Sequence, residues 1–160
     1  MTQPPLDKID YRILEALQAD GSISNLELAE KVNLSPSPCS RRVRILEERG
    51  YIRGKVTLLE AQKLGLSVNV FIQVSLSHQL KKDLQAFEEA VTQWPEVMEC
   101  YLMTGDFDYL IRVVVPDLMA YQRFLDDHLT LIEGIDSIRS SFSLKQVRYK
   151  TDLPLDHLKR

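Results

Sequence analysis

Two aspartates, Asp106 and Asp108, flank Phe107 in the stretch TGDFDY. Carboxylates at this spacing can serve as a catalytic acid and base, hold a metal ion, bind an ammonium group or form a polar turn. No Ser-His or Cys-His arrangement is placed near the pair, and no third metal ligand follows at motif spacing. We therefore expect neither an enzyme nor a metal site. A receptor for an amino acid and a plain polar turn both remain open.

A second set of polar side chains belongs to the stretch SPSPCSRRVRILEERG, residues 35–50. On a helical wheel, most of its serines and arginines fall opposite Cys39, Val43 and Leu46. A helix of this kind fits the major groove of DNA, where Arg can form two hydrogen bonds with guanine. The candidate DNA-binding residues, one of them beyond the helix, are Ser35, Ser37, Ser40, Arg41, Arg42, Arg44 and Lys55.

The distribution of charge points to DNA more clearly than the total charge does. The formal net charge is −3, yet residues 41–55 contain six basic residues against two acidic ones. A local positive patch is what phosphate binding requires, and an acidic remainder does not forbid it. The alternatives are a solvated helix face and a small helical dimerisation module, which would not need three arginines within four positions.

The composition is that of a soluble globular protein, with 160 residues, 44% of them hydrophobic and 27% charged. No apolar run is long enough to span a bilayer, and the N-terminus does not resemble a secretory signal. Cys39 and Cys100 are expected to be free thiols in a reducing cytoplasm. The three histidines are too far apart in the sequence to form a zinc site with them.

The first half of the chain has the hydrophobic period of helices. Apolar residues three to four apart predict a first helix in LDKIDYRILEALQADG, and Ser24 with Glu27 forms a capping box that begins a second. Ser35 is the expected N-cap of the third helix, which Gly50 ends. Three helices with a tight turn between the last two predict a helix-turn-helix. The following stretch, YIRGKVTLL, is predicted to be a short wing or a connecting strand.

The period changes from Leu66 onwards. Strict alternation over residues 66–77 predicts a strand with Phe71 on its otherwise polar face. Helical and strand patterns then follow in the order βαββαβ, which is the ferredoxin-like unit. The predicted fold is α+β, with an N-terminal (winged) helix-turn-helix and a C-terminal ferredoxin-like domain. The predicted boundaries are 1–54 for the helix-turn-helix, 55–65 for a linker or connecting strand, 66–148 for the second domain and 149–160 for a polar tail.

The chain resembles the Lrp/AsnC family, the leucine-responsive or feast/famine regulators of bacteria and archaea. Two stretches carry the resemblance, residues 6–52 and residues 97–124. They include the family pattern of Arg42, Val43, Leu46, Glu47, Gly50 and Ile52. The resemblance implies a DNA-binding N-terminal domain and a C-terminal domain that senses amino acids. It also implies dimers formed by sheet pairing that assemble into tetramers or octamers.

The resemblance also implies where the effector binds. In relatives it lies at the contact between dimers, beside the Gly-Asp-Phe-Asp turn. The effector-binding residues implied here are Leu102, Thr104, Gly105, Asp106, Phe107, Asp108 and Tyr109. Backbone amides of the turn would hold a carboxylate, and an aspartate would hold the ammonium group. Leu118 and residues 141–143 are expected to pack nearby.

The sequence thus predicts a transcriptional regulator whose assembly and DNA binding respond to a small, apolar amino-acid effector, with no other cofactor. The expected partners are double-stranded DNA, the amino acid and further copies of the chain, with no membrane. The expected location is the cytoplasm, in association with the bacterial nucleoid. Two other functions remain open: an amino-acid-binding regulatory subunit of a metabolic enzyme, and a DNA-architectural protein that needs no effector.

Overall fold

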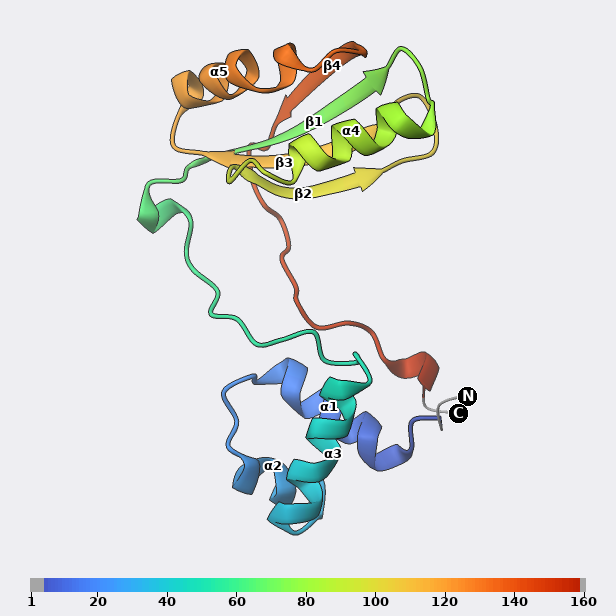
Figure 1. The fold of residues 1–160 in the computed structure, drawn as a ribbon. Helices are drawn as coiled ribbons and strands as arrows, with labels where there is room; N and C mark the ends of the chain where they lie inside the picture. The colour runs from blue at the N-terminus through green and yellow to red at the C-terminus, as the bar shows by residue number, and fades with distance from the viewer. Residues whose placement is uncertain (1–4, 159–160) are drawn as a thin grey trace. The chain divides into compact units, whose positions relative to one another are not determined.

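The structure, a computed structural model, describes residues 5–158. The chain divides into two compact units. Unit 1 contains the residues up to Leu58 together with those from Arg148 onwards, and unit 2 is Leu59–Val147 (Figure 1). Within residues 5–158, no helix combines the length and the apolar character needed to cross a membrane.

Unit 1 is built from three helices: α1, Lys8–Ala19; α2, Asn25–Lys31; and α3, Pro36–Glu48. Each helix presents an apolar side to a common core. The buried residues of that core are Ile13, Ala16, Leu28, Ala29, Val32, Cys39 and Leu46. Burying these side chains is what stabilises helices too short to persist alone. The predicted helix-turn-helix is confirmed, with α3 as its second helix.

The ends of these helices follow the expected local chemistry, with one exception. Ser24 and Glu27 form the predicted capping box at the start of α2. Gly50 follows α3 with a φ of +75°, a conformation that glycine adopts readily. Ser35 occupies the N-cap position of α3, but its side chain makes no capping hydrogen bond. The Ser35 hydroxyl is therefore not committed to capping the helix.

Unit 2 has the βαββαβ order that the sequence predicts. Its elements are β1, Val68–Leu76; α4, Lys81–Val91; β2, Val97–Leu102; β3, Tyr109–Val115; α5, Leu118–Asp127; and β4, Ile135–Phe142. The sheet order is β2-β3-β1-β4, and all neighbouring strands are antiparallel. Apolar residues of α4 and α5 share one core with the same face of the sheet, so both helices cover that face.

The other face of the sheet is mainly polar. Arg112 on β3 donates a hydrogen bond to Asn69 on β1 at 3.1 Å and forms an ion pair with Glu99 on β2 at 2.9 Å. Phe71 stands on this polar face and is 36% exposed. The alternation predicted for β1 is therefore confirmed, including the aromatic ring on the polar side.

Three segments differ from the sequence predictions. No strand forms in residues 55–65, where the only regular element is a short 3₁₀ helix at Gln62–Leu64. The last strand, which the alternation predicted over residues 137–147, is Ile135–Phe142, and among the described residues after it only the Ser143 amide bonds β1, at the Asn69 carbonyl. Of the segment predicted as a polar tail, 149–160, the described residues 149–158 belong to unit 1.

Candidate functional site

The exposed side of α3 gathers most of the predicted DNA-binding residues. Ser35, Ser37, Ser40, Arg41 and Arg44 are all exposed. A shallow hollow over this side is lined by Asn25, Pro36, Ser37, Ser40, Arg41 and Arg44. We name this surface, made of Ser37, Ser40, Arg41 and Arg44, the α3 face. Hydroxyl and guanidinium groups on one convex helix surface are able to bond both phosphates and base edges.

Asn25 at the start of α2 lines the same hollow and is not among the DNA-binding residues predicted from the sequence. Its side-chain amide donates a hydrogen bond to the Pro36 carbonyl at 2.9 Å. This bond joins the first residue of α2 to the first residue of α3. Its position directly after the capping Ser24, at the exposed start of α2, was the available signal.

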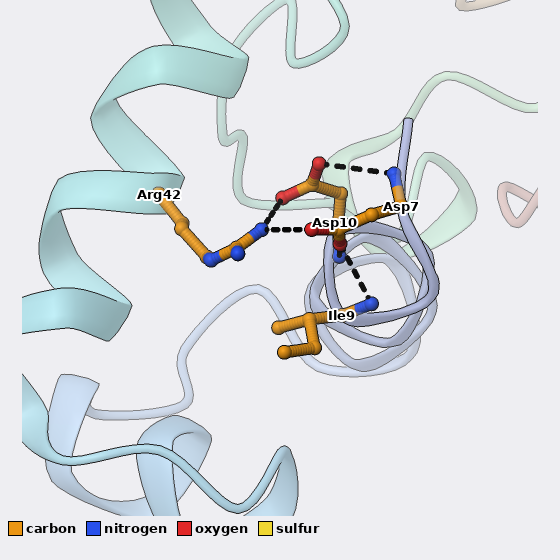
Figure 2. A network of polar contacts seen from close by, with 4 residues as sticks. All are labelled: Asp7, Ile9, Asp10 and Arg42. Atoms are coloured by element: carbon orange, nitrogen blue, oxygen red, sulfur yellow. Dashed lines mark hydrogen bonds and ion pairs between the residues drawn. The ribbon is translucent and has the colours of Figure 1, made fainter. Parts of the chain in front are cut away.

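Arg42 lies at the edge of this surface, on the side of α3 that meets α1. One nitrogen of its guanidinium donates to Asp7 and to Asp10, each at 2.7 Å (Figure 2). The hydrogen bond to Asp7 is the largest cause that raises the pKa of Arg42, and the hydrogen bond to Asp10 is the next. Burial acts to raise the pKa of Asp7, but the Asp10 amide and Arg42 outweigh it and the pKa is lowered. The structure therefore bonds Arg42 to α1, although Arg42 also lines a surface hollow with Ser37 and Arg41 of the α3 face.

Lys55 is also separate from the α3 face. It is exposed and lies in the irregular segment that follows α3. It lines a different cavity, together with residues of α1 and of the C-terminal segment. Since this segment has no regular hydrogen bonding, the fold does not fix Lys55 in a position relative to Arg41.

The TGDFDY turn joins β2 to β3, and its outer residues are accessible. Leu102, Thr104, Gly105 and Asp106 are exposed, and Phe107 is half-buried. Gly105 has a φ of +118°, a region that side-chain-bearing residues rarely adopt. The Met103 amide donates to the Asp108 carbonyl at 2.8 Å and closes the turn. The glycine and the predicted turn are thus where the sequence placed them.

Asp108 faces inward and is 9% exposed. One of its carboxylate oxygens accepts the Leu76 amide at 2.7 Å, and the other accepts the Gln79 side-chain amide at 2.7 Å. Asp108 therefore ties the end of β1 and the following loop to the start of β3. It was expected to be available to an ammonium group, but both of its oxygens already have partners within the chain.

Tyr109 is likewise a core residue, with 1% exposure. Its ring packs on Phe87 with centroids 4.5 Å apart, and its hydroxyl donates to Glu88 at 2.7 Å. Burial, followed by the hydrogen bond to Glu88, raises the pKa of Tyr109. The side chain alternates with Leu110 across the strand, so it points towards α4 and away from the outer surface of the turn.

Leu118 and residues 141–143 were expected to pack beside the TGDFDY turn, but they lie at the other end of the sheet in this chain. Tyr109 pairs with Val74 near the end of β1, whereas Phe142 pairs with Val70 near its start. Leu118 begins α5, just after β3 has ended beside Val68. Leu118 and residues 141–143 therefore do not pack against the turn of the same chain. The expected proximity is wrong within one copy.

Together, the two units define a DNA-binding regulator with a separate ligand-binding domain. Residues 6–53 match the winged helix-turn-helix DNA-binding family, and residues 69–153 match the Lrp/AsnC ligand binding domain. The chain belongs to the Lrp/AsnC family of transcriptional regulators. The resemblance noted in the sequence is confirmed.

Relatives with assigned names match along nearly the whole chain. The Bkd operon transcriptional regulator of Pseudomonas aeruginosa is 49% identical over 150 residues, covering 94% of this chain and 98% of that protein. The leucine-responsive regulatory protein of Escherichia coli is 40% identical over 148 residues, covering 92% and 90%.

Solved structures agree with this assignment. A transcriptional regulator from Neisseria meningitidis in complex with L-Met aligns with a TM-score of 0.90 at 41% identity, covering 96% of this chain and 99% of that one. An AsnC family regulator from Agrobacterium tumefaciens aligns with a TM-score of 0.89 at 43% identity, covering 95% and 99%.

Proposed function

We propose that this regulator binds a pseudo-palindromic DNA duplex through the α3 face, and that its DNA binding and assembly respond to a small amino acid held at the TGDFDY turn. The observation that carries the proposal is the joint exposure of Ser37, Ser40, Arg41 and Arg44 on the second helix of the motif. In helix-turn-helix proteins the N-terminal part of this helix approaches the base edges.

The side chains of the α3 face are suited to this role. Arg44 contacts Glu48 at 3.6 Å, and both side chains are more than 60% exposed. An exposed ion pair of this kind stabilises a protein little, so a DNA phosphate can replace Glu48 as the partner of the Arg44 guanidinium. We propose that Arg41 reads a base and that Arg44 contacts phosphate or base. Ser37 and Ser40 are short enough to bond either.

The effector is proposed to sit outside the turn. Its carboxylate meets backbone amides near Gly105–Phe107, and its ammonium group meets Asp106 or a carbonyl oxygen. Asp108 supports this site from within by fixing the loop at Leu76 and Gln79. A relative was crystallised with L-Met and others are named leucine-responsive, which supports a small apolar amino acid. We propose no catalytic activity and no other cofactor.

Assembly is proposed to involve the polar face of the sheet. The exposed ring of Phe71 lies on an inner strand of this face, and the edge strand β2 adds the exposed side chain of Tyr101. Apolar groups of this size on a polar surface are typical of subunit contacts. We propose a dimer through this face, and a tetramer or octamer in which another copy closes the effector site. Effector binding is then linked to assembly.

Two alternatives differ in measurable ways. An amino-acid-binding subunit of an enzyme would bind an amino acid without binding duplex DNA, even at low salt. An architectural protein would bind DNA in the nucleoid with an affinity that no amino acid changes. The matched DNA-binding domain favours the regulator over the enzyme subunit.

The test has two parts. A thermal-shift screen of the twenty amino acids identifies the effector, because a ligand at a hundred times its Kd stabilises the native state by about 2.7 kcal/mol. DNA affinity is then compared among the parent, Arg41→Ala and the control Arg123→Ala, which removes an exposed arginine of unit 2. Arg41→Ala should weaken specific binding by about 1–3 kcal/mol. Equal affinity for all three proteins would overturn the assignment of α3.

A further inference from the structure

The C-terminal segment returns to the DNA-binding unit after the sheet is complete. Beyond β4 the chain runs without regular structure and ends in a 3₁₀ turn, Asp156–Leu158, that belongs to unit 1 (Figure 1). Unit 2 is therefore inserted between two parts of unit 1. The covalent chain connects the two units twice, once before β1 and once after β4.

A pair of hydrogen bonds fixes the segment to α1. The Gln18 side-chain amide donates to the Leu153 carbonyl at 2.9 Å, and its carbonyl oxygen accepts the Leu153 amide at 3.0 Å. One side chain thus satisfies both the donor and the acceptor of a single residue, as a neighbouring strand would. The two residues are 135 positions apart in the sequence, so the contact is tertiary.

An apolar groove receives the rest of the segment. Its cavity of about 590 Å³ is lined on the unit 1 side mainly by Leu6, Leu14, Leu17, Tyr51 and Ile52. The segment contributes Leu153, Pro154, Leu155, His157 and Leu158. This volume is the space that remains between the segment and unit 1, so the segment covers the groove without filling it. We name it the α1 groove.

The depth of docking differs along the segment. Leu155 is half-buried, whereas Leu153 is 68% and Leu158 is 38% exposed. The half-buried Leu155 and the Gln18–Leu153 amide pair are two of the segment's contacts with unit 1, and each is modest. A contact of this strength is expected to open and close without unfolding the helices.

We infer that the α1 groove is a binding site whose ligand is the chain's own segment 151–158, and that the docked segment forms a second connection from unit 2 to α1. The two connections start side by side, since β1 begins where β4 ends. The Ser143 amide donates to the Asn69 carbonyl at 2.9 Å at that end.

Amide hydrogen exchange on the full chain tests the inference. In the parent, peptides covering residues 150–158 should exchange more slowly than the same synthetic peptide in solution, by on the order of tenfold. Gln18→Glu keeps the acceptor for the Leu153 amide but repels its carbonyl. Leu155→Asp places a charge against the apolar groove. Both variants should bring the exchange of 150–158 close to that of the free peptide and should speed exchange in α1.

The control is Gln93→Glu, which makes the same chemical change at an exposed position in unit 2. It should leave the exchange of 150–158 unchanged. The inference is overturned if the parent segment already exchanges like the free peptide, or if Leu155→Asp keeps full protection. Protection that disappears on dilution would show that a second copy supplies the segment and would refute the connection within one chain. None of these outcomes depends on DNA or on an effector.

Discussion

Arg42 of α3 donates a hydrogen bond to Asp10 of α1 at 2.7 Å, from the same nitrogen that bonds Asp7 at 2.7 Å. Asp7 and Asp10 also form the capping box that begins α1. One guanidinium therefore links the start of α1 to the middle of α3. This link helps to fix the orientation of the α3 face relative to α1, in addition to the apolar core that the helices of unit 1 share.

Arg42→Ala and Arg41→Ala should differ in their effect on the stability of unit 1. Arg42→Ala should lower the free energy of unfolding of unit 1 by about 1 kcal/mol, a charge-assisted bond discounted for partial exposure. Arg41→Ala should change it by less than about 0.5 kcal/mol, since its side chain is exposed. Denaturant titration followed by circular dichroism measures both values. If Arg42→Ala is as stable as the parent and loses DNA affinity, Arg42 belongs to the reading surface.

Asp7 makes a pH-dependent contribution to stability. Its folded pKa is lowered below the ordinary value of 3.8, so its contribution is complete above that value and is lost as the pH falls through the folded pKa. Asp7→Asn keeps an N-cap side chain but removes the charge. The difference in unfolding free energy between parent and Asp7→Asn should be constant from neutral pH to about pH 5 and should shrink below pH 4. A difference that does not change with pH would show that the charge contributes nothing.

Local sequence patterns predicted the helices and strands, but they did not predict contacts between residues far apart in the sequence. The Ser24–Glu27 capping box and the alternation around Phe71 depend on residues within one turn or one strand, so the sequence reveals them. The bonds from Arg42 to α1 and from Gln18 to Leu153 join positions that only tertiary packing brings together. For the same reason, the sequence did not predict which residues of the TGDFDY turn face inward.

Asp108 illustrates this. The sequence places it beside Asp106, and the two seem equivalent as partners for an ammonium group. Only the pairing of β1 with β3 brings the Leu76 amide and the Gln79 side chain to its carboxylate. The exposed turn could be predicted from Gly105, whereas the inward direction of Asp108 and Tyr109 required the register of the sheet.

Asp108→Asn and Asp106→Asn separate support of the turn from contact with the effector. Asp108→Asn should lower the stability of unit 2 by about 1–3 kcal/mol, because one buried donor loses its acceptor. Asp106→Asn should leave stability within about 0.5 kcal/mol and weaken effector binding. Thermal unfolding and effector titration measure the two effects. A fully stable Asp108→Asn would contradict the supporting role.

Gly105→Ala should lower the stability of unit 2 because of the backbone conformation at this position, and not because of a steric clash. An added Cβ would meet no atom within 4 Å, but the φ of +118° is unfavourable for alanine. The expected loss of stability is about 1 kcal/mol or more. Gly21→Ala is the matched control, since the nearest atom to its Cβ is at an ordinary 3.9 Å and its φ is not in that region. Equal midpoints in thermal unfolding for the two variants would show that the turn relaxes freely.

Phe71→Glu should weaken the proposed dimer. The change removes the exposed ring from the polar face and places a negative charge there. Gln73→Glu is the control, because it adds the same charge on the same face of β1 without removing an aromatic ring. Light scattering at micromolar concentration should give a smaller mass for Phe71→Glu than for Gln73→Glu. A parent protein that is a monomer under these conditions would rule out the proposed assembly.

The most direct test of the regulator is a DNA titration with and without the amino acid found by the thermal-shift screen. Fluorescence anisotropy of a labelled pseudo-palindromic duplex is measured at two salt concentrations, with a random duplex as the competitor. The account predicts binding that weakens steeply between about 50 and 200 mM salt and an affinity for the specific duplex that the amino acid changes by about 5-fold or more. Absence of duplex binding at low salt, or an affinity that none of the twenty amino acids alters, would contradict it.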